Sequence, residues 1–539
     1  MKMSGADAMV KCLELEGVET LFGYPGVAIA PFFNSLYDSK IRTVLVRAEQ
    51  NAGHAASGYA RMTGRPGVCV ATSGPGATNL VTALATAYAD SIPLVAITGQ
   101  VKTELLGRDV FQEVDITGAC AAFIKHSYLV KDVKDIPRVF KEAFYIAGTG
   151  RQGPVLIDMP IDIQNSTLSF EYPKEVSIRS YKPTVKGHNM QVKKVAKALK
   201  EAKRPVICSG GGVLLAHAEA EIRELCEKQG IPVINTMMGI GSMPSDHPLY
   251  FGMLGNNGKP YANRAVYESD LLVIVGARVA DRAVSQAHAI EKNTTVIHID
   301  VDPAEIGKNL GTTIPLVGDA KQVLRQIIDE CQPTGHPEWV ETLNGWKRDY
   351  VPPKPRREGY VFAPHFVKRL CEKLADDAVY TSDVGQNQMW SAGNYIVKDG
   401  KFLTTGGMGT MSYALPAAMG AKAACPDKQV VAVAGDGAFQ MSMMEWATIR
   451  QYNIPVKQVV MHNNYLGLVR EYQHNNYHDR YSGVDLTGSP DLEMIAAAYG
   501  VPFIRVHNED EMEAALDKFL SIEGSCLMEI LVDPMETVQ

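Results

Sequence analysis

The stretch of sequence that decides the fold is VVAVAGDGAFQMSMMEWATIRQYNIPVKQVVMHNN, residues 430–464. It opens with an apolar run that ends in GDG. It closes with a second apolar run that ends in Asn463 and Asn464, and a helix-like segment lies between them. A strand, a helix and a second strand form a parallel β-α-β unit, in which the carboxyl ends of both strands meet at one edge of the sheet. The stretch therefore predicts an α/β domain with polar groups gathered at that edge.

The residue types at this edge suit a bound diphosphate. Asp436 offers a carboxylate and Asn464 an amide oxygen, and Mg²⁺ prefers oxygen ligands that it shares with phosphate. Gly435 and Gly437 allow close approach of the backbone, and the helix start at Ala438 offers N–H groups to an anion. Two ordinary strand-end turns are the alternative reading of the same pattern. The spacing of 25 residues between GDG and the asparagine pair favours the diphosphate site.

The same alternation of β-rich runs and helical patterns continues along the chain, which predicts parallel sheets flanked by helices. Predicted strands cover 68–72, 94–98, 155–159, 205–210, 271–277, 295–300, 430–437 and 456–463. Two polar stretches that contain proline, 165–187 and 332–362, are predicted linkers. They divide the chain into three α/β domains at 1–165, 188–332 and 362–539.

Composition excludes several classes of protein. The chain has 539 residues, too many for a single core, and its net charge of −7 is spread without long runs, which argues against nucleic-acid or membrane partners. No apolar stretch reaches the ~20 residues of a membrane helix. The N-terminal residues do not form a signal-peptide pattern. Nine scattered cysteines without a CxxC pair favour reduced thiols and a cytoplasmic location.

Beyond residues 430–464, which match the thiamine-diphosphate fingerprint GDG-x(about 25)-NN, most of the chain resembles the acetohydroxyacid synthase (acetolactate synthase) large-subunit family. The segments that carry this resemblance are FGYPGVAIAPFF (22–33), VLVRAEQNAGHAASGYAR (44–61), ATSGPGATNLVTALATAYADSIPLVAITGQV (71–101), GRDVFQEVDI (107–116), TSDVGQNQMW (381–390) and TTGGMGTMSYALPAAMGA (404–421). The resemblance implies a thiamine-diphosphate-binding fold. Its first domain binds the pyrimidine ring, its third binds the diphosphate and Mg²⁺, and the cofactor lies between domains that normally belong to different subunits.

The resemblance also assigns roles to individual residues. Glu49 would hydrogen-bond the aminopyrimidine ring and promote loss of the C2 proton; without the resemblance it reads as a helix-start glutamate stabilised by the helix dipole. Ala48 replaces the histidine that is usual in the family. The metal would be held by Asp436, Asn464 and the main-chain carbonyl of Leu466. Further implied residues are Gln112 and Lys125 for catalysis, Val27, Phe111 and Tyr472 for the substrate, and Gly26, Gln386, Gly409, Met411, Gly435, Gly437, Ala438 and Leu468 for the cofactor.

The middle domain carries a glycine run, Gly210, Gly211 and Gly212, which is compatible with a dinucleotide phosphate or with a structural turn. The segments LVIVGARVADR (272–282) and HIDVDPAEIGKN (298–309) resemble those that surround FAD in the family. The resemblance implies that the glycine run, Arg278 and Asp300 hold FAD. Arg282 would grip the carboxylate of the second keto acid. Three departures leave the FAD site open: Val279 and Ala280 replace Phe and Asp, and Asn257 replaces His.

The implied activity is decarboxylation of pyruvate on thiamine diphosphate, followed by ligation of the hydroxyethyl carbanion to pyruvate or 2-ketobutyrate in branched-chain amino-acid biosynthesis. A homodimer or homotetramer is implied, with a small regulatory subunit as a further partner. The alternatives are a flavin-free catabolic acetolactate synthase or another thiamine-diphosphate-dependent 2-keto acid decarboxylase or lyase. The absence of a His-His pair argues against the decarboxylases. A non-enzymatic regulatory subunit is disfavoured because Glu49, Asp436 and Asn464 are all retained.

Acceptor choice is the finest prediction from the sequence. In LGLVREYQ (466–473), Tyr472 replaces the tryptophan that lines the acceptor pocket in the family, and Leu468 replaces methionine. The sequence ends at VDPMETVQ (532–539), where the family usually continues with a covering tail. We expect a more open site and a weaker preference for 2-ketobutyrate. The alternative is that Tyr472 packs as an ordinary helix aromatic.

Overall fold

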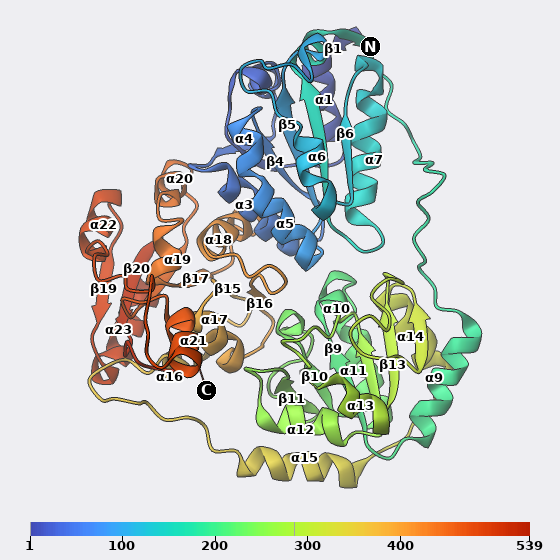
Figure 1. The fold of residues 1–539 in the computed structure, drawn as a ribbon, viewed down its shortest axis with the longest axis vertical. Helices are drawn as coiled ribbons and strands as arrows, with labels where there is room; N and C mark the ends of the chain where they lie inside the picture. The colour runs from blue at the N-terminus through green and yellow to red at the C-terminus, as the bar shows by residue number, and fades with distance from the viewer. Residues whose placement is uncertain (1, 285, 539) are drawn as a thin grey trace.

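The computed structural model describes residues 2–284 and 286–538 and contains three six-stranded parallel sheets, each in its own domain (Figure 1). The predicted fold class, α/β with three parallel sheets flanked by helices, is confirmed. Each predicted strand coincides with an observed strand to within two residues at either end. Agreement is this close because buried parallel strands are short, continuous apolar runs.

The first sheet has the order β3-β2-β4-β5-β7-β6. Its strands are β2 Thr20–Gly23, β3 Arg42–Leu45, β4 Gly67–Ala71, β5 Leu94–Gln100, β6 His126–Leu129 and β7 Pro154–Pro160. Its helices are α1 Gly5–Leu15, α2 Ala30–Leu36, α3 Glu49–Thr63, α4 Pro75–Asn79, α5 Val81–Asp90, α6 Ile116–Cys120, α7 Ile136–Gly148 and α8 Ile161–Asn165. A two-stranded antiparallel pair, β1 Lys2–Ser4 and β8 Thr167–Ser169, ties the start of the chain to the first connection.

The middle sheet has the order β11-β10-β9-β12-β13-β14. Its strands are β9 Pro205–Ser209, β10 Val233–Asn235, β11 Tyr250–Met253, β12 Leu271–Val275, β13 Thr295–Asp300 and β14 Ile314–Val317. Its helices are α9 Asn189–Glu201, α10 Gly211–Leu215, α11 Glu219–Gln229, α12 Pro260–Glu268, α13 Ala287–Asn293 and α14 Ala320–Glu330. In chain order this arrangement is 3-2-1-4-5-6, which is the strand order of dinucleotide-binding domains.

The third sheet has the order β16-β15-β17-β18-β20-β19. Its strands are β15 Val379–Ser382, β16 Lys401–Leu403, β17 Val430–Gly435, β18 Lys457–His462, β19 Phe503–Val506 and β20 Cys526–Leu531. Its helices are α16 Ala363–Lys373, α17 Gln386–Asn394, α18 Ala414–Ala424, α19 Asp436–Gln440, α20 Glu445–Gln451, α21 Gly467–Tyr477, α22 Leu492–Tyr499 and α23 Glu509–Ser521. The first and third sheets share the order 2-1-3-4-6-5, so the two domains repeat one topology.

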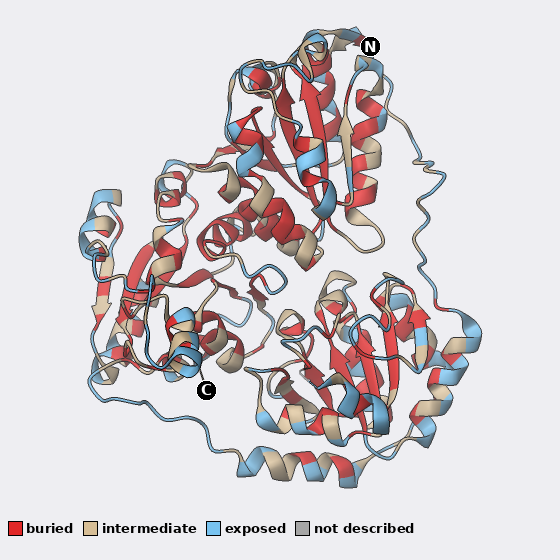
Figure 2. Ribbon diagram, viewed as in Figure 1, coloured by how far each residue is buried: buried red, intermediate tan, exposed pale blue. Residues whose placement is uncertain are grey.

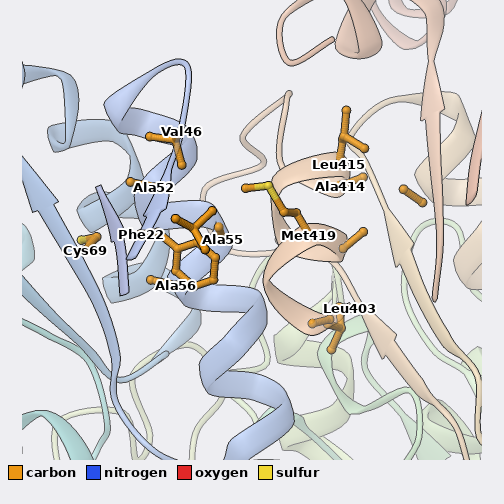
Figure 3. Packing of buried hydrophobic residues seen from close by; sticks show 14 of the residues in the cluster. Phe22, Val46, Ala52, Ala55, Ala56, Cys69, Leu403, Ala414, Leu415 and Met419 are labelled. Carbon is orange, nitrogen blue, oxygen red and sulfur yellow. The ribbon is translucent and has the colours of Figure 1, made fainter. Parts of the chain in front are cut away.

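The first and third domains pack together through α3 and α18, which are equivalent helices of the repeated topology. Figure 3 shows Met419 of α18 on the side that faces Ala55 of α3, and both belong to one buried apolar cluster. A Cβ atom on Gly58 would overlap the main-chain oxygen of Ala417, so only glycine allows this close approach. The helix that begins at Glu49 is therefore held directly against the third domain.

The second connection contains one more helix than the sequence indicated. Helix α15, Pro337–Asp349, lies inside the stretch 332–362 that was predicted as a linker. Its residues Trp339 and Leu343 are buried in the middle domain, and the indole of Trp339 donates to the carbonyl of Pro205 at 3.1 Å. The strands of all three sheets are mostly buried, whereas both connections are largely exposed (Figure 2). Across the described residues, no helix is long and apolar enough to span a bilayer.

Candidate functional site

Asp436 and Asn464, which the sequence assigns to one site, lie together at the carboxyl ends of β17 and β18. Asp436 opens α19 and is 3% exposed. Its Oδ1 accepts the N–H of Gly437 at 3.0 Å, and its Oδ2 accepts the N–H of Asn464 at 2.7 Å. Asn464 has φ 59°, in the left-handed region that asparagine tolerates better than most residues. The GDG motif and the asparagine pair thus form one structure at a single edge of the sheet.

A row of charged side chains lies behind this pair. The Nε2 of His462 is 3.7 Å from Asp436 and 2.8 Å from the side-chain oxygen of Asn464, while its Nδ1 contacts Glu529. Glu529 also accepts from Arg505 at 2.5 Å. Burial lowers the pKa of His462, but the hydrogen bonds with Glu529 and Asn464 outweigh it and raise the pKa to about 9. Burial raises the pKa of Asp436, partly offset by His462, so a divalent cation at this carboxylate would relieve an unfavourable burial of charge.

Met411 and Leu466 lie beside the same glycine. A Cβ added to Gly437 would lie 3.6 Å from Met411 Cε and 2.9 Å from Leu466 Cδ2. The carbonyl of Leu466 accepts the N–H of Arg470 at 2.9 Å, and a carbonyl retains a second lone pair for another partner. The structure therefore brings the predicted metal residues and Met411, a predicted cofactor residue, together.

A buried carboxylate holds the turn that carries Met411. Asp383 accepts the N–H groups of Val384 at 2.8 Å and of Ser412 and Ala414, both at 2.9 Å. Ser412 has φ 76°, a strained conformation for a residue with a side chain. Burial raises the pKa of Asp383 to about 6, against the three N–H donors. The sequence did not single out Asp383, although it lies within the quoted segment 381–390.

Gln386 begins α17 and is bound within the protein. Its amide nitrogen donates to Glu471 at 2.9 Å and to the carbonyl of Glu536 at 2.8 Å, and its oxygen accepts from Asn463 at 3.1 Å. The segment that contains Glu536 thereby packs onto α17 and α21. The predicted contact of Gln386 with a diphosphate stays a prediction. The neighbouring Asn387 donates to the carbonyl of Asp383 at 2.8 Å.

In the first domain, Glu49 is the first residue of α3 and faces the loop between β4 and α4. One of its oxygens accepts from Asn79 at 3.0 Å, and the other would lie 3.3 Å from a Cβ on Gly76. The helix start expected from the sequence is present. The side chain is partly exposed at the edge of the loop, as a group that meets a ligand has to be.

Other predicted residues surround the same loop. A Cβ on Gly26 would lie 2.5 Å from the hydroxyl of Thr72, and one on Gly74 would lie 2.9 Å from Cβ of Gln112. Gln112 itself has φ 62°. Val27 and Phe111 are 79% and 87% exposed, which is unusual for large apolar side chains and typical of a surface that meets a ligand or a partner.

Lys125 is placed differently from the other predicted residues. Its ammonium group donates to the carbonyl of Ile146, to that of Thr149 at 2.8 Å and to the hydroxyl of Tyr181 at 2.9 Å. These acceptors use all three ammonium protons. Burial lowers the pKa of Lys125 to about 7. The contacts tie the first connection to its domain, and a catalytic role for Lys125 stays a prediction.

A cavity of about 760 Å³ lies where residues of all three domains meet. Its wall includes eight residues that the sequence had assigned to cofactors or substrate: Gly211, Gly212, Arg278, Arg282, Asp300, Gly409, Leu468 and Tyr472. Gly210 lies directly against Gly276 and Ala277. Predictions made from separate domains thus converge on one space.

The middle-domain wall of this cavity is the point where the strand order reverses, between β9 and β12. A Cβ on Gly212 would lie 2.7 Å from Cα of Gly276, so the two loops touch without room for side chains. Burial raises the pKa of Asp300 to about 6. Val279 has φ 47°, which is rare for a β-branched residue. Ligands bind at such switch points in open α/β sheets.

Arg282 and Tyr472, which were predicted to contact the second keto acid, line the cavity and are exposed. Arg282 pairs only loosely with Asp281, at 3.7 Å, with 85% of each side chain exposed, so its guanidinium is accessible to a ligand. Tyr472 is 58% exposed, and its ring packs edge-on against Tyr477 with the centroids 5.9 Å apart. Leu468 lies on the same helix, α21.

Sequence reasoning missed a contact on the cavity wall between Asp90 of the first domain and a loop of the third domain. Asp90 accepts the N–H of Gly407 at 2.7 Å and of Gly406 at 3.2 Å, and its carboxylate is 3.6 Å from Arg61. This contact binds the first domain to the loop that precedes Met411. A carboxylate at the end of the apolar helix α5 was the available signal, because buried acids are rare unless they are paired.

Comparisons with known proteins agree along the whole chain. Three family models match: the thiamine pyrophosphate enzyme N-terminal TPP binding domain over residues 3–119, the central domain over 192–327 and the C-terminal TPP binding domain over 383–530. The chain is 44% identical to a probable acetolactate synthase large subunit of Methanocaldococcus jannaschii, over 99% of this chain and 93% of the relative. It is 44% identical to the acetolactate synthase large subunit of Corynebacterium glutamicum, over 96% and 84%. It is 40% identical to that of Haemophilus influenzae, over 100% and 96%.

Proposed function

The chain belongs to the acetolactate synthase large subunits of the thiamine pyrophosphate enzyme family, and we propose that its own residues carry out that reaction. The enzyme decarboxylates pyruvate and joins the remaining two-carbon unit to a second 2-keto acid, as in branched-chain amino-acid biosynthesis. The observation that carries this proposal is the single edge at which Asp436, Asn464, Leu466 and Met411 meet.

The residues at this edge fit a diphosphate held through Mg²⁺. Asp436 supplies a buried carboxylate, while Asn464 and the carbonyl of Leu466 supply neutral oxygens. This donor set suits a hard cation, which takes its remaining ligands from phosphate and water. When bound, thiamine diphosphate supplies the carbon nucleophile that makes decarboxylation feasible. Met411, beside Gly437, would contact the cofactor.

In this proposal Glu49 takes part in removing the C2 proton of the cofactor. Its carboxylate sits at a helix start beside Gly76 and Asn79, with the partial exposure that contact with a cofactor ring requires. It would hold a proton on the aminopyrimidine ring, so that the ring can remove the proton from the C2 carbon. Gln112, which lies close to Gly74 of the same loop, would border the same space.

The second keto acid would bind at the cavity wall formed by Arg282, Leu468 and Tyr472. A guanidinium fork matches a planar carboxylate, and that of Arg282 is accessible. Leu468 and Tyr472 would contact the alkyl part of the acceptor. Pyruvate and 2-ketobutyrate differ by one methylene, so this contact would set the product ratio.

The cavity also fits FAD. Its middle-domain wall has the strand order of dinucleotide-binding domains, and Gly211, Gly212 and Arg278 stand at the switch point. Gly211 and Gly212 begin α10 on the cavity wall, where backbone N–H groups could meet a pyrophosphate, and Arg278 would offer charge to it. Asp300 lines the same space. In this family FAD performs no net redox chemistry, so we assign these residues binding alone.

A flavin-free acetolactate synthase is the second candidate. The observation that favours it is the wall at Val279 and Ala280, which has lost the aromatic and acidic side chains of the family motif. The colour and flavin content of the purified protein separate the two candidates.

Association and location are further parts of the proposal. The name "large subunit" of the relatives supports a small regulatory partner. A homodimer or homotetramer would bring a second copy of the exposed Val27 and Phe111 surface to the site. We assign the enzyme to the cytoplasm, following its scattered free cysteines.

The test is to supply the purified protein with pyruvate, thiamine diphosphate and Mg²⁺, with and without FAD, and to identify the product. We expect 2-acetolactate, and 2-aceto-2-hydroxybutyrate when 2-ketobutyrate is added. Acetaldehyde as the main product would identify a decarboxylase instead, and a lack of turnover would contradict the enzymatic function.

A further inference from the structure

Glu445 of the third domain contacts the strand-to-helix turn that presents Glu49. Its Oε1 accepts the N–H of Arg47 at 2.8 Å, the N–H of Ala48 at 3.2 Å and the side-chain amide of Asn51 at 2.9 Å. Its Oε2 accepts the hydroxyl of Thr448 at 2.7 Å. Glu445 is completely buried, so these contacts are shielded from water.

The turn needs an acceptor from elsewhere. The N–H groups of Arg47 and Ala48 immediately precede the first turn of α3, of which Ala48 is the N-cap and carries no polar side chain. A shielded N–H without a partner is costly. Glu445, 397 positions after Ala48 in the sequence, accepts both N–H groups. Because Glu49 directly follows Ala48, the carboxylate of Glu445 determines where the first turn of α3 begins.

The equivalent helix of the third domain is held in the same way. Tyr413 at the N-cap of α18 makes no side-chain capping bond, and the buried carboxylate of Asp383 accepts the N–H groups of Ser412 and Ala414. That contact fixes the turn after Met411, as the contact of Glu445 fixes the turn before Glu49. Two buried carboxylates thus hold the two helix starts that carry the proposed cofactor contacts.

We propose that Glu445 is a positioning residue that sets the place of Glu49 by capping the turn 47–48 across the domain interface. This inference rests on the role proposed for Glu49. Glu445 begins α20, which follows the GDG motif and α19 along the chain. The same segment therefore leads from the diphosphate edge to the turn that presents Glu49.

The experiment compares three substitutions in the holoenzyme by the rate of hydrogen exchange at the cofactor C2 carbon. Glu445→Gln keeps an acceptor at the same reach and should stay within a factor of about three of the unmodified enzyme. Glu445→Asp keeps the charge but draws the oxygens back by one methylene, and Glu445→Met removes the acceptor. Both should slow exchange about ten- to a hundredfold, because small displacements of a catalytic group have effects of that size. Thiamine diphosphate affinity should change far less than the exchange rate.

The matched control is Tyr452→Phe. The hydroxyl of Tyr452 accepts the N–H of Leu45 at 3.0 Å, also across the domain interface, but two residues before Arg47. Its loss should lower the unfolding temperature without slowing exchange. Equal slowing in Tyr452→Phe would overturn the proposal, since general loosening of the interface would then be the cause. An exchange rate in Glu445→Gln as low as in Glu445→Met would overturn it as well, because charge rather than position would then matter.

A double-substitution cycle separates this inference from the proposed function. In a Glu49→Gln background, Glu445→Asp should have no further effect, because Glu445 acts through Glu49. If Glu49→Gln slows exchange but Glu445→Asp and Glu445→Met do not, the proposed function stands and the positioning role is wrong. If the unmodified protein shows no C2 exchange, or Glu49→Gln leaves it unchanged, the proposed function itself fails.

Discussion

The loop after β4 and the loop after β17 occupy the same place in two sheets of identical strand order. The first reads Ser73-Gly74-Pro75-Gly76, and the second reads Gly435-Asp436-Gly437. Both loops have close neighbours, which are atoms of Gln112 at Gly74 and side chains such as that of Leu466 at Gly437. The second places a buried carboxylate at the sheet edge, whereas the first has no ionisable side chain and is bordered by Glu49.

The same comparison holds after the preceding strand of each chain segment, β3 and β16. Glu49 stands at the start of α3, after β3, and Met411 stands before α18, after β16. One topology thus presents a carboxylate in one domain and an apolar thioether in the other. The scaffold determines where a side chain can be presented, and the residue at that position determines its chemistry. Each prediction below changes one position of this repeated arrangement, or of the middle domain that differs from it.

Asp436→Ala should have the largest effect, because it removes the carboxylate that distinguishes the two loops. Loss of a buried charged partner is worth about 3–5 kcal/mol, so Mg²⁺-dependent affinity for thiamine diphosphate should fall about a thousandfold. Affinity titrations with and without Mg²⁺, or after chelation, provide the measurement. Asp436→Asn, which keeps one oxygen, should lose less. Unchanged metal-dependent binding in Asp436→Ala would mean that GDG is only a turn.

Glu49→Gln should leave folding and cofactor affinity intact but slow C2 exchange about ten- to a thousandfold, the usual range for a lost acid–base contribution. Exchange of the C2 hydrogen and thermal unfolding are measured on the same preparation. Asn79→Ala removes the hydrogen-bond donor to Glu49 but keeps the carboxylate, so it should be the milder change. Near-normal exchange in Glu49→Gln would remove Glu49 from the proposed chemistry.

Arg278→Ala tests the domain whose strand order differs. If this wall binds the FAD pyrophosphate, loss of a charged hydrogen bond should weaken flavin binding about tenfold or more. Quenching of flavin fluorescence gives the affinity. The control is Arg282→Ala in the same cavity, which should leave flavin binding unchanged and raise the KM for the keto acid. Equal flavin affinity in all three proteins would mean that Arg278 does not hold FAD, whereas no flavin binding by the unmodified protein would favour the flavin-free candidate.

Tyr472→Trp should have the smallest effect. A larger apolar surface in the acceptor pocket should shift the product ratio toward 2-aceto-2-hydroxybutyrate about fivefold, since one methylene is worth about 1–3 kcal/mol. A competition assay with pyruvate and 2-ketobutyrate measures the ratio. Tyr477→Trp, on the partner ring of the same helix, should leave the ratio unchanged. An unchanged ratio in Tyr472→Trp would mean that Tyr472 does not set acceptor choice.

The features predicted from sequence are those that short stretches determine. The apolar runs before GDG and before Asn463 predicted β17 and β18, and the helix start at Glu49 was also expected from its surroundings. Buried strands and helix starts have local signatures, because the period of apolar residues and the chemistry of strand ends are properties of neighbouring residues. The hydrogen bond between Asp436 and Asn464 follows from the parallel arrangement of their two strands.

The tertiary structure alone decided which distant residues meet. Nothing near Ala48 indicates that Glu445 accepts its N–H, and nothing near Asp90 indicates the loop at Gly407 that it holds. The burial of Trp339, which converts a predicted linker into α15, depends in the same way on a surface built elsewhere. Residue identities by themselves determined the strands, the helix starts and the chemistry available at each strand end. The packing of α3 against α18 decided the domain interface and the caps that cross it, because such contacts depend on the shapes of whole folded surfaces and have no local pattern.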